Sequence, residues 1–340
     1  MNMKAMVLKK IAPIEEEPLK LEDVPIPQPG FKQILIKVYA CGICRTELDE
    51  IEGRLKPPKL PVILGHQVVG RVYELGPGAS KYKINDRVGI GWIYHACGEC
   101  YFCKKGNENL CYQFKGTGYN ADGGYAEYMV INEDFAYPIP EIFSDVEAAP
   151  LLCGGAIGYR ALKLTGMQDG DTIGLYGYGS SAHIIHQVIK YKFPNSRVYV
   201  FTKRAGDEPS ELARKAGAEW VGKTGDTPPR KLNYAIDTTP VGLPIKEALR
   251  NLERGGRLVI NLIRKETPIP ELDYATHLWD EKEIKSVANI TRKDIEEFLI
   301  LASKIPIKPE INVFKLEEAN KALIMLKHGE YKGSGVLKIL

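Results

Sequence analysis

The stretch TIGLYGYGSSAHIIHQVIKYK, residues 172–192, joins a short apolar run to a helical pattern through a glycine-rich turn. The run at 172–177 predicts a strand, and the spacing of apolar residues over 180–192 predicts a helix. Gly177 and Gly179 permit a tight turn and let a pyrophosphate approach the helix amino terminus, while Ala182 is small enough for close packing. An ordinary glycine turn is the alternative, but the flanking strand and helix favour a dinucleotide site.

Strands and helices continue to alternate after this turn. The predicted strands are 197–202, 232–239, 257–263 and 284–289, and the predicted helices are 209–218 and 243–252. This alternation is typical of a Rossmann-type doubly wound parallel sheet in an α/β domain, which we expect to cover residues 154–289. Just before it, the pattern over 144–166 predicts one helix, with Ser144 or Asp145 as its cap.

The first 153 residues show a different sequence pattern. Short alternating or apolar runs are broken by glycine and proline, which predicts a compact and irregular β-rich domain. Near the carboxyl end, residues 292–304 and 315–330 show helical patterns, and 333–340 predicts a strand that returns to the first domain. We therefore expect a catalytic domain made of residues 1–153 and 290–340, with a cysteine-rich lobe at 95–112.

The composition limits the possible functions. The chain has 340 residues with a formal net charge of +3, 44% hydrophobic and 26% charged residues, which suits two domains with their own cores. The nearly balanced charge gives no reason to expect nucleic acid or a membrane surface as a partner. The amino terminus does not have the pattern of a signal peptide, and no apolar run approaches the ~20 residues that cross a bilayer. We expect a cytoplasmic protein.

Seven cysteines stand in the chain, and four of them form a C-x2-C-x2-C-x7-C row: Cys97, Cys100, Cys103 and Cys111. Four thiolates on one short lobe can close a tetrahedron around a structural zinc ion. An iron–sulfur cluster is less favoured, because the bacterial ferredoxin spacing is absent. A nucleic-acid zinc ribbon would need two knuckles far apart, and disulfides are rare in an intracellular chain of this size.

Three further residues can bind a metal: Cys44 (or Cys41), His66 and Cys153. Two thiolates and an imidazole leave a fourth position open, as in a catalytic zinc site that acts as a Lewis acid on a substrate oxygen. Taken singly, His66 is equally compatible with a satisfied core histidine, and Cys153 with a small buried apolar residue. Their occurrence beside a dinucleotide motif favours the metal site.

The end of the second strand of the dinucleotide domain bears on the choice of coenzyme. Thr202, Lys203 and Arg204 stand where an NAD site has an acid that binds the ribose hydroxyls. A hydroxyl and two cations suit the 2′-phosphate of NADP, so the sequence favours NADP over NAD. Asp207 and Glu208 lie close by and oppose this preference.

The whole chain resembles the medium-chain zinc-containing alcohol dehydrogenases. The motifs that carry the resemblance are CGICRTELD, GHQVVGRVYELG, CGECYFCKKGNENLC, GGYAEY, APLLCGGAIGYRAL, GLYGYGSSA and LARKAGAEWV. The resemblance implies that the β-rich domain is GroES-like. It also implies that Cys44, and not Cys41, is the ligand of the catalytic zinc with His66 and Cys153, and that the four-cysteine lobe holds a second, structural zinc.

The same resemblance assigns further roles near the zinc. Thr46 would hydrogen-bond the substrate oxygen and pass on its proton, and Arg45 would contact the pyrophosphate of the coenzyme. Trp92 and Tyr119 would line the substrate pocket, although plain core packing explains Trp92 equally well. A homo-oligomer follows from the resemblance, with a tetramer favoured over a dimer.

Two positions depart from the family pattern. Gln67 stands where many members have a carboxylate after the zinc histidine, and an amide adds no negative charge near the metal. Asp49 stands where the proton relay usually ends in a histidine, and an aspartate of ordinary pKa ~3.9 is a poor relay at neutral pH unless burial raises that pKa. The relay would then end in water, or Asp49 would be a surface acid.

The function favoured by the sequence is a zinc-dependent alcohol dehydrogenase or aldehyde reductase, which transfers hydride between an alcohol and NADP (or NAD). A polyol or sugar dehydrogenase of the same fold is the first alternative. A zinc-free quinone or enoyl reductase would have no reason to keep the three candidate zinc ligands. A catalytically idle nucleotide-binding or structural protein is disfavoured by Thr46 and the complete ligand set.

Overall fold

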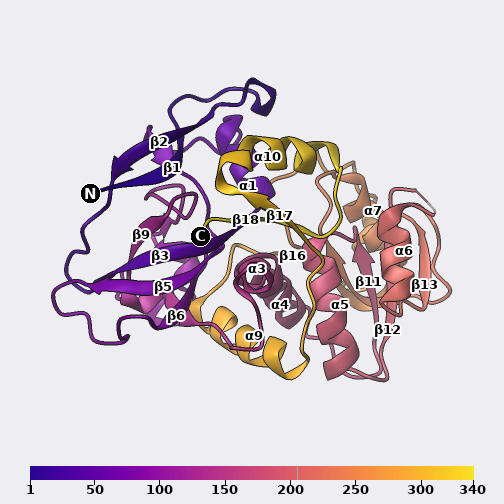
Figure 1. Ribbon diagram of the computed structural model, residues 1–340. Helices are drawn as coiled ribbons and strands as arrows, with labels where there is room; N and C mark the ends of the chain where they lie inside the picture. Colours follow the sequence, from indigo (N-terminus) through magenta and orange to yellow (C-terminus); the bar gives the residue numbers. More distant parts are fainter. Residues whose placement is uncertain (205) are drawn as a thin grey trace. The chain divides into compact units, whose positions relative to one another are not determined.

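The computed structural model in Figure 1 describes residues 1–204 and 206–340. The chain folds into two compact units. The first consists of Met1–Cys153 and Ile290–Leu340, and the second of Gly154–Asn289. Among the described residues, no helix is long and apolar enough to cross a membrane.

The second unit is built on a six-stranded parallel sheet in the order β13-β12-β11-β14-β15-β16. Its strands are β11 (Thr172–Tyr176), β12 (Arg197–Thr202), β13 (Trp220–Lys223), β14 (Leu232–Asp237), β15 (Leu252–Ile260) and β16 (Glu283–Ser286). Its helices are α4 (Gly154–Thr165), α5 (Ser180–Lys192), α6 (Glu208–Lys215), α7 (Leu243–Asn251) and α8 (Tyr274–His277). The predicted Rossmann-type sheet is confirmed, and the strand order changes direction between β11 and β14.

The central strand β11 explains why this sheet forms. All five of its residues are buried, as expected for a strand covered on both faces. The ring of its last residue, Tyr176, stacks on Phe201 of β12 with centroids 4.0 Å apart, and Leu232, Ile245 and Leu258 belong to the same apolar cluster. The short strand β13 was not predicted, because four residues with no alternation give too weak a pattern.

The first unit is a β-rich domain around a seven-stranded mixed sheet. Six of its strands follow the order β10-β6-β5-β3-β18-β17, with β9 also paired to β3. These strands are β3 (Gln33–Ile43), β5 (Val68–Leu75), β6 (Arg87–Ile90), β9 (Tyr128–Asn132), β10 (Ala136–Pro138), β17 (Ile311–Lys315) and β18 (Ser334–Lys338). The smaller sheets contain β1 (Asn2–Leu8), β2 (Leu19–Pro25), β4 (Val62–Ile63), β7 (Ile93–His95) and β8 (Lys115–Gly116).

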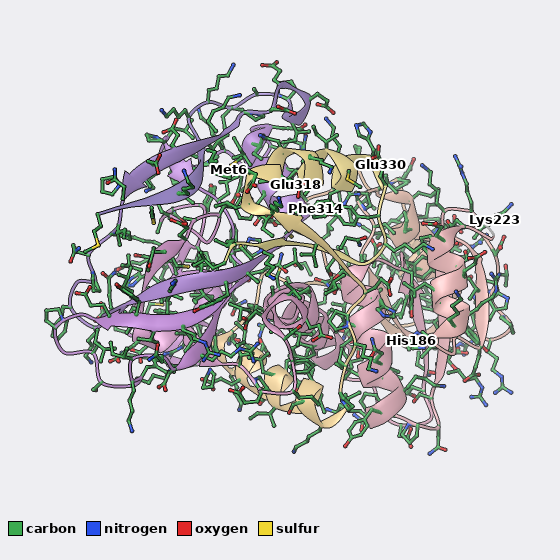
Figure 2. The ribbon with its side chains drawn as sticks, in the orientation of Figure 1. Met6, His186, Lys223, Phe314, Glu318 and Glu330 are labelled. Atoms are coloured by element: carbon green, nitrogen blue, oxygen red, sulfur yellow. The ribbon has the colours of Figure 1, made fainter. Side chains whose placement is uncertain are left out.

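The α-helices of the first unit are α1 (Arg45–Ile51), α2 (Tyr101–Lys104), α3 (Asp145–Ala148), α9 (Arg292–Lys304) and α10 (Ala319–His328). Its 3₁₀ turns are η1 (Ile14–Glu16), η2 (Glu108–Leu110), η3 (Glu133–Phe135), η4 (Ala149–Leu152) and η5 (Leu316–Glu318). The last strand, β18, pairs antiparallel with β3, so the predicted return of the carboxyl terminus to this domain is confirmed. Segments far apart in the sequence therefore share one core, to which Met6 of β1 and Phe314 of β17 both belong (Figure 2).

The single helix predicted over residues 144–166 is wrong. Ser144 caps a short helix, α3, which passes into the 3₁₀ turn η4, and α4 starts only at Gly154. Pro150 has no N–H to give to a continuing helix, and two glycines follow Cys153, where helix propensity is lowest. Cys153 adopts φ −129° and ψ −78° at this break. The break takes Cys153 out of a helical backbone.

Candidate functional site

Cys44 stands at the junction of a strand and a helix. It follows the last residue of β3 and occupies the N-cap position of α1, with extended backbone angles of φ −129° and ψ 160°. The carboxylate of Glu47, three residues on, accepts a hydrogen bond of 2.8 Å from the Cys44 backbone N–H through Oε2. This capping arrangement satisfies a helix-terminal donor and holds the Cys44 side chain at the start of the helix.

His66 is buried beside the same carboxylate. Only 1% of His66 is exposed, and its Nδ1 lies 2.7 Å from the other oxygen of Glu47, Oε1. A carboxylate on one ring nitrogen fixes the tautomer and leaves the other nitrogen to bind a metal. That nitrogen, Nε2, lies 3.3 Å from the sulfur of Cys153. Glu47 therefore positions two of the three candidate ligands at once.

The candidate ligand atoms of Cys44, His66 and Cys153 lie within 4.8 Å of one another. A hydrogen bond from Cys153 lowers the pKa of the Cys44 thiol well below its usual value, although burial opposes the shift. Burial is the largest single effect on the pKa of His66 and lowers it, but the charges and hydrogen bonds of Glu47 and Cys44 together outweigh burial and hold that pKa well above its usual value. A thiolate and a place that favours positive charge fit a divalent cation with nitrogen and sulfur ligands, such as Zn²⁺.

Cys41 does not share this cluster. It is fully buried on β3, with its sulfur 3.7 Å from the carbonyl oxygen of Gly42, and burial raises its pKa well above the ordinary value. A neutral thiol in an apolar surrounding behaves as a small packing residue. The structure thus brings together Cys44, His66 and Cys153 and leaves Cys41 apart from them.

The four cysteines of the lobe form a second cluster, and their sulfurs also lie within 4.8 Å of one another. The sulfur of Cys97 is 3.5 Å from that of Cys111 and 3.9 Å from that of Cys103, close to the roughly 3.8 Å of a tetrahedral zinc–thiolate site. A backbone N–H of Cys103 is the main cause that lowers the pKa of Cys100 to about 6, which favours the thiolate. The donor set fits a closed zinc site.

Two of the residues expected around the substrate, Thr46 and Trp92, contact candidate metal ligands. Thr46 is buried on α1, with its hydroxyl 3.5 Å from the Cys44 sulfur, whereas Arg45 is exposed. The Trp92 ring meets the His66 ring edge-on, with centroids 4.9 Å apart, and stacks on Tyr119 at 6.0 Å. Trp92 and Tyr119 therefore form an aromatic wall beside the candidate metal ligands.

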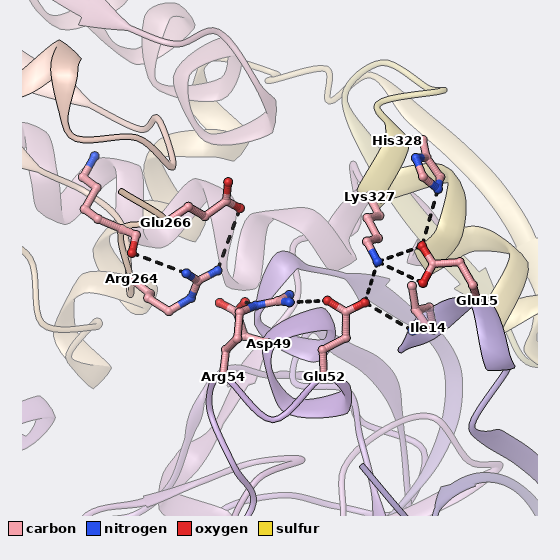
Figure 3. Close-up of polar contacts among 10 residues, drawn as sticks. Ile14, Glu15, Asp49, Glu52, Arg54, Arg264, Glu266, Lys327 and His328 are labelled. Atoms are coloured by element: carbon pink, nitrogen blue, oxygen red, sulfur yellow. Dashed lines mark hydrogen bonds and ion pairs between the residues drawn. The ribbon is translucent and has the colours of Figure 1, made fainter. Parts of the chain in front are cut away.

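Asp49 is not a surface acid. It is 6% exposed, and one of its carboxylate oxygens accepts a hydrogen bond of 2.5 Å from Nε of Arg54. Figure 3 shows the network that this pair joins: Arg54 also binds Glu52, Glu52 binds Lys327 of α10 at 2.7 Å, and Lys327 binds Glu15. An aspartate engaged in this way serves to anchor the loop after α1.

Gln67 is also buried, and it packs against the backbone of β3. A Cβ atom on Gly42 would approach the Gln67 side-chain carbon Cδ to 2.8 Å, so the side chain lies directly against this glycine. The backbone N–H of Gly42 donates to the backbone carbonyl of Gln67 at 2.9 Å. Gln67 therefore supports the strand that leads to Cys44.

The glycine-rich turn lies at the carboxyl end of β11. Gly177 has φ +83°, and a Cβ there would come within 2.8 Å of the Thr238 hydroxyl, so glycine is required. Gly179 precedes α5 as its N-cap and gives no side-chain cap, and a Cβ on it would meet no protein atom within 4 Å. A helix start that follows a glycine with open space around it fits the binding of a phosphate. Ala182 is buried on α5.

Thr202 ends β12, and Lys203 and Arg204 follow it at the carboxyl end of the sheet. Lys203 and Arg204 are exposed, whereas Thr202 is buried, with its hydroxyl bonded to the Arg204 carbonyl at 3.0 Å. Asp207 accepts hydrogen bonds from Ser210 N–H at 3.0 Å and from Arg204 N–H at 3.2 Å. Asp207 therefore caps the start of α6, while its side chain stays beside Arg204, so the opposition to an anion that the sequence suggested is not removed.

Sequence reasoning missed Glu47, although a signal for it was present. Glu47 stands three residues after Cys44, the spacing of a capping box, at the start of a helix. The contact with His66, nineteen residues further along the chain, gives it a role near the metal that this spacing alone does not show.

Known proteins are similar to this chain over its whole length. Residues 30–141 match the alcohol dehydrogenase GroES-like domain family. A probable alcohol dehydrogenase, AdhA, of Mycobacterium tuberculosis is 41% identical over 343 residues, covering 99% of this chain and 98% of that protein. An alcohol dehydrogenase of Geobacillus stearothermophilus is 36% identical over 99% of this chain and 100% of its own length.

A solved structure shows the same fold. The alcohol dehydrogenase of the archaeon Aeropyrum pernix superposes with a TM-score of 0.87 at 27% identity, covering 98% of this chain and 99% of that one. Both halves of the sequence are thus matched by full-length relatives. The chain belongs to the medium-chain zinc-containing alcohol dehydrogenases, oxidoreductases that use zinc and NAD(P) and act on small alcohols or aldehydes.

Proposed function

We propose that Cys44, His66 and Cys153 hold the catalytic zinc of this alcohol dehydrogenase. The convergence of their three ligand atoms within 4.8 Å, with Glu47 bound to two of the three residues, is the observation that supports it. Zinc held there supplies a Lewis acid for the oxygen of the substrate. On this proposal, residues 1–153 and 290–340 are the catalytic domain, and residues 154–289 bind the dinucleotide.

The residues around the ligands orient the histidine, transfer the proton and bind the coenzyme. Glu47 keeps the His66 ring in one orientation and leaves its Nε2 available. The Thr46 hydroxyl would hydrogen-bond the substrate oxygen and relay the proton released when the alcohol is oxidised, passing its own hydroxyl proton on towards the coenzyme ribose or water. Arg45, which is exposed at the start of α1, binds the pyrophosphate of the coenzyme.

The preferred substrates are apolar alcohols and the corresponding aldehydes. Trp92 and Tyr119 present stacked rings beside His66, and aromatic faces favour apolar carbon chains over polyhydroxy ones. A panel of primary, secondary, aromatic and polyhydroxy alcohols, each oxidised with NADP and with NAD, tests this. We expect higher kcat/KM for the apolar alcohols. A clear preference for polyols or sugars would contradict the proposed pocket.

NADP is the preferred coenzyme on this proposal. Lys203 and Arg204 are exposed beyond β12, and the nearby carboxylate of Asp207 is engaged at the start of α6. Replacing both cations by serine removes the partners of a 2′-phosphate, and a charge-assisted hydrogen bond contributes about 1.5–3 kcal/mol. The kcat/KM for NADP should therefore fall by at least about ten- to a hundred-fold, the loss expected for a single such bond, whereas that for NAD should change little. Steady-state kinetics with both coenzymes decide it, and equal losses would contradict the assignment.

We also propose a homo-oligomer, in which the edge strand β16 pairs with the same strand of a second copy to form a dimer; the favoured tetramer would contain two such dimers. All four residues of β16 are exposed, including Ile284, and the rings of Tyr274 and Trp279 meet 5.8 Å apart in the preceding segment, more than half exposed. An uncovered edge flanked by apolar side chains is a typical pairing surface. Sedimentation equilibrium of the purified chain measures the size, and a monomer would contradict the proposal.

A further inference from the structure

A buried ion pair joins the carboxyl end of strand β14 to the loop after β15. Asp237, the last residue of β14, is fully buried, and the side chain of Lys265 in the loop after β15 is 16% exposed. The Lys265 ammonium nitrogen lies 2.5 Å from Asp237 Oδ2 and 2.5 Å from the carbonyl oxygen of Thr239. The other oxygen of Asp237 accepts from the N–H and the hydroxyl of Thr239, at 2.9 and 2.6 Å.

Stability alone explains this pair poorly. Removing two charges from water is costly, and replacing a buried ion pair by apolar residues of similar size is often neutral or stabilising. An apolar pair would hold β14 and the next loop together equally well. The charged pair is therefore better explained by what Lys265 contacts besides Asp237.

The position of the pair in the sheet indicates what else Lys265 contacts. The strand register aligns Tyr176, Asp237 and Ile260 at the carboxyl ends of β11, β14 and β15. The strand order changes direction between β11 and β14, and in open α/β sheets dinucleotides bind outside the carboxyl ends of the strands at such a point. Lys203 and Arg204 follow β12, on the other side of β11 from Asp237. If those cations bind the adenosine phosphate, Lys265 lies on the side of the nicotinamide nucleotide.

The chemistry of the ammonium group limits further which atom of the coenzyme Lys265 can bind. A lysine ammonium has three N–H donors, and the described part of the chain offers acceptors for two of them, on Asp237 and Thr239. Because Asp237 balances the charge, the remaining donor suits a neutral oxygen better than a phosphate. We propose that Lys265 is a coenzyme-positioning residue whose third N–H binds a neutral oxygen of the nicotinamide nucleoside, either a ribose hydroxyl or the carboxamide carbonyl.

The neighbouring residues support a positioning role. Arg264 lies 3.8 Å from Glu266 (Figure 3) and donates to the Lys265 carbonyl at 3.3 Å, and the Glu266 N–H donates to the Pro240 carbonyl at 2.6 Å, so the peptide after Lys265 is hydrogen-bonded through both its carbonyl and its N–H. The backbone N–H of Asn261 also donates to the Asp237 carbonyl at 2.8 Å. A donor held this rigidly loses little entropy when a ligand accepts its hydrogen bond.

Fragments of the coenzyme test the proposal, which rests on the proposed dinucleotide site. Calorimetry or ligand-observed NMR would measure the binding of NADPH, 2′,5′-ADP, nicotinamide mononucleotide and nicotinamide riboside to the full chain and to Lys265→Met. We expect about ten-fold weaker binding of NADPH and of both nicotinamide fragments, and unchanged binding of 2′,5′-ADP. Equal changes for all four ligands, or none, would overturn the proposal, and an effect on the mononucleotide alone would overturn the choice of a neutral oxygen.

Two further variants separate binding from folding. Lys282→Met is the matched control, because Lys282 is another partly buried lysine of this unit that donates to two backbone carbonyls, of Leu249 and Thr276. It should bind all four ligands as the original chain does. The double variant Asp237→Asn/Lys265→Met leaves no unpaired charge, so its thermal midpoint should exceed that of Lys265→Met while nicotinamide affinity stays low. Recovery of that affinity would show a purely structural pair. If the original chain binds none of the fragments, the proposed coenzyme site itself fails.

Discussion

Replacing Cys44 by serine is expected to abolish turnover, whereas Cys41→Ser should keep most of it. The Cys44 sulfur belongs to the cluster with His66 and Cys153, while the Cys41 thiol is buried apart from it. A hydroxyl is a far weaker zinc ligand than a thiolate, and a Lewis acid contributes several kcal/mol to stabilising charge in the transition state. The expected loss in kcat for Cys44→Ser is more than about a thousand-fold.

Metal analysis makes this pair of variants decisive. On the proposed assignment, the original chain and Cys41→Ser contain two zinc ions, and Cys44→Ser contains one, because the four-cysteine lobe is untouched. Both substitutions replace a cysteine by serine within four residues, so a general effect of the exchange would appear in both. If the Cys44→Ser variant keeps most of its activity and two zinc ions, or if the Cys41→Ser variant is inactive and contains one, the ligand assignment would be reversed.

The sequence predicted the sheet well because its signals are local. The run before Gly177, the small residues of the turn and the apolar spacing of the next helix all lie within about twenty residues, and strand and helix patterns follow at regular intervals. The weak points were also local: β13 is too short to show a pattern, and the break at Cys153 depends on how Pro150 and the two glycines compete with a helical apolar pattern. The fold class is confirmed; the roles of individual site residues stay proposals.

What the sequence could not provide are contacts between distant residues. The Glu47 oxygens reach both Cys44 and His66, and Lys265 reaches Asp237 across twenty-eight positions. No periodicity brings such pairs together; they result from strand register and from loops that follow neighbouring strands. Asp49 shows the same limit, since its burial and its bond to Arg54 decide its role, and neither follows from its place in the motif.

Cys100→Ser is expected to lower the stability of the protein strongly while turnover is retained at low temperature. Cys44→Ser, in contrast, is expected to abolish turnover. Zinc would hold the lobe by four thiolates, and a structural zinc of this kind contributes directly to the free energy of folding. The lobe is also anchored to α9 by Glu108, a buried acid that accepts a 2.8 Å hydrogen bond from the Arg292 backbone N–H. Loss of the metal should therefore loosen both the lobe and the start of α9.

The size of the effect follows from the energies involved. Losing a few kcal/mol of folding free energy lowers the thermal midpoint of a domain of this size by on the order of 10 °C. Calorimetry with and without added zinc measures the midpoint, and metal analysis should return one zinc per chain. Lys104→Ser is the matched control, since Lys104 is an exposed residue of the same lobe outside the cluster, and it should keep both zinc ions and the original midpoint. A Cys100→Ser chain that keeps two zinc ions and melts normally would show that the lobe holds no structural metal.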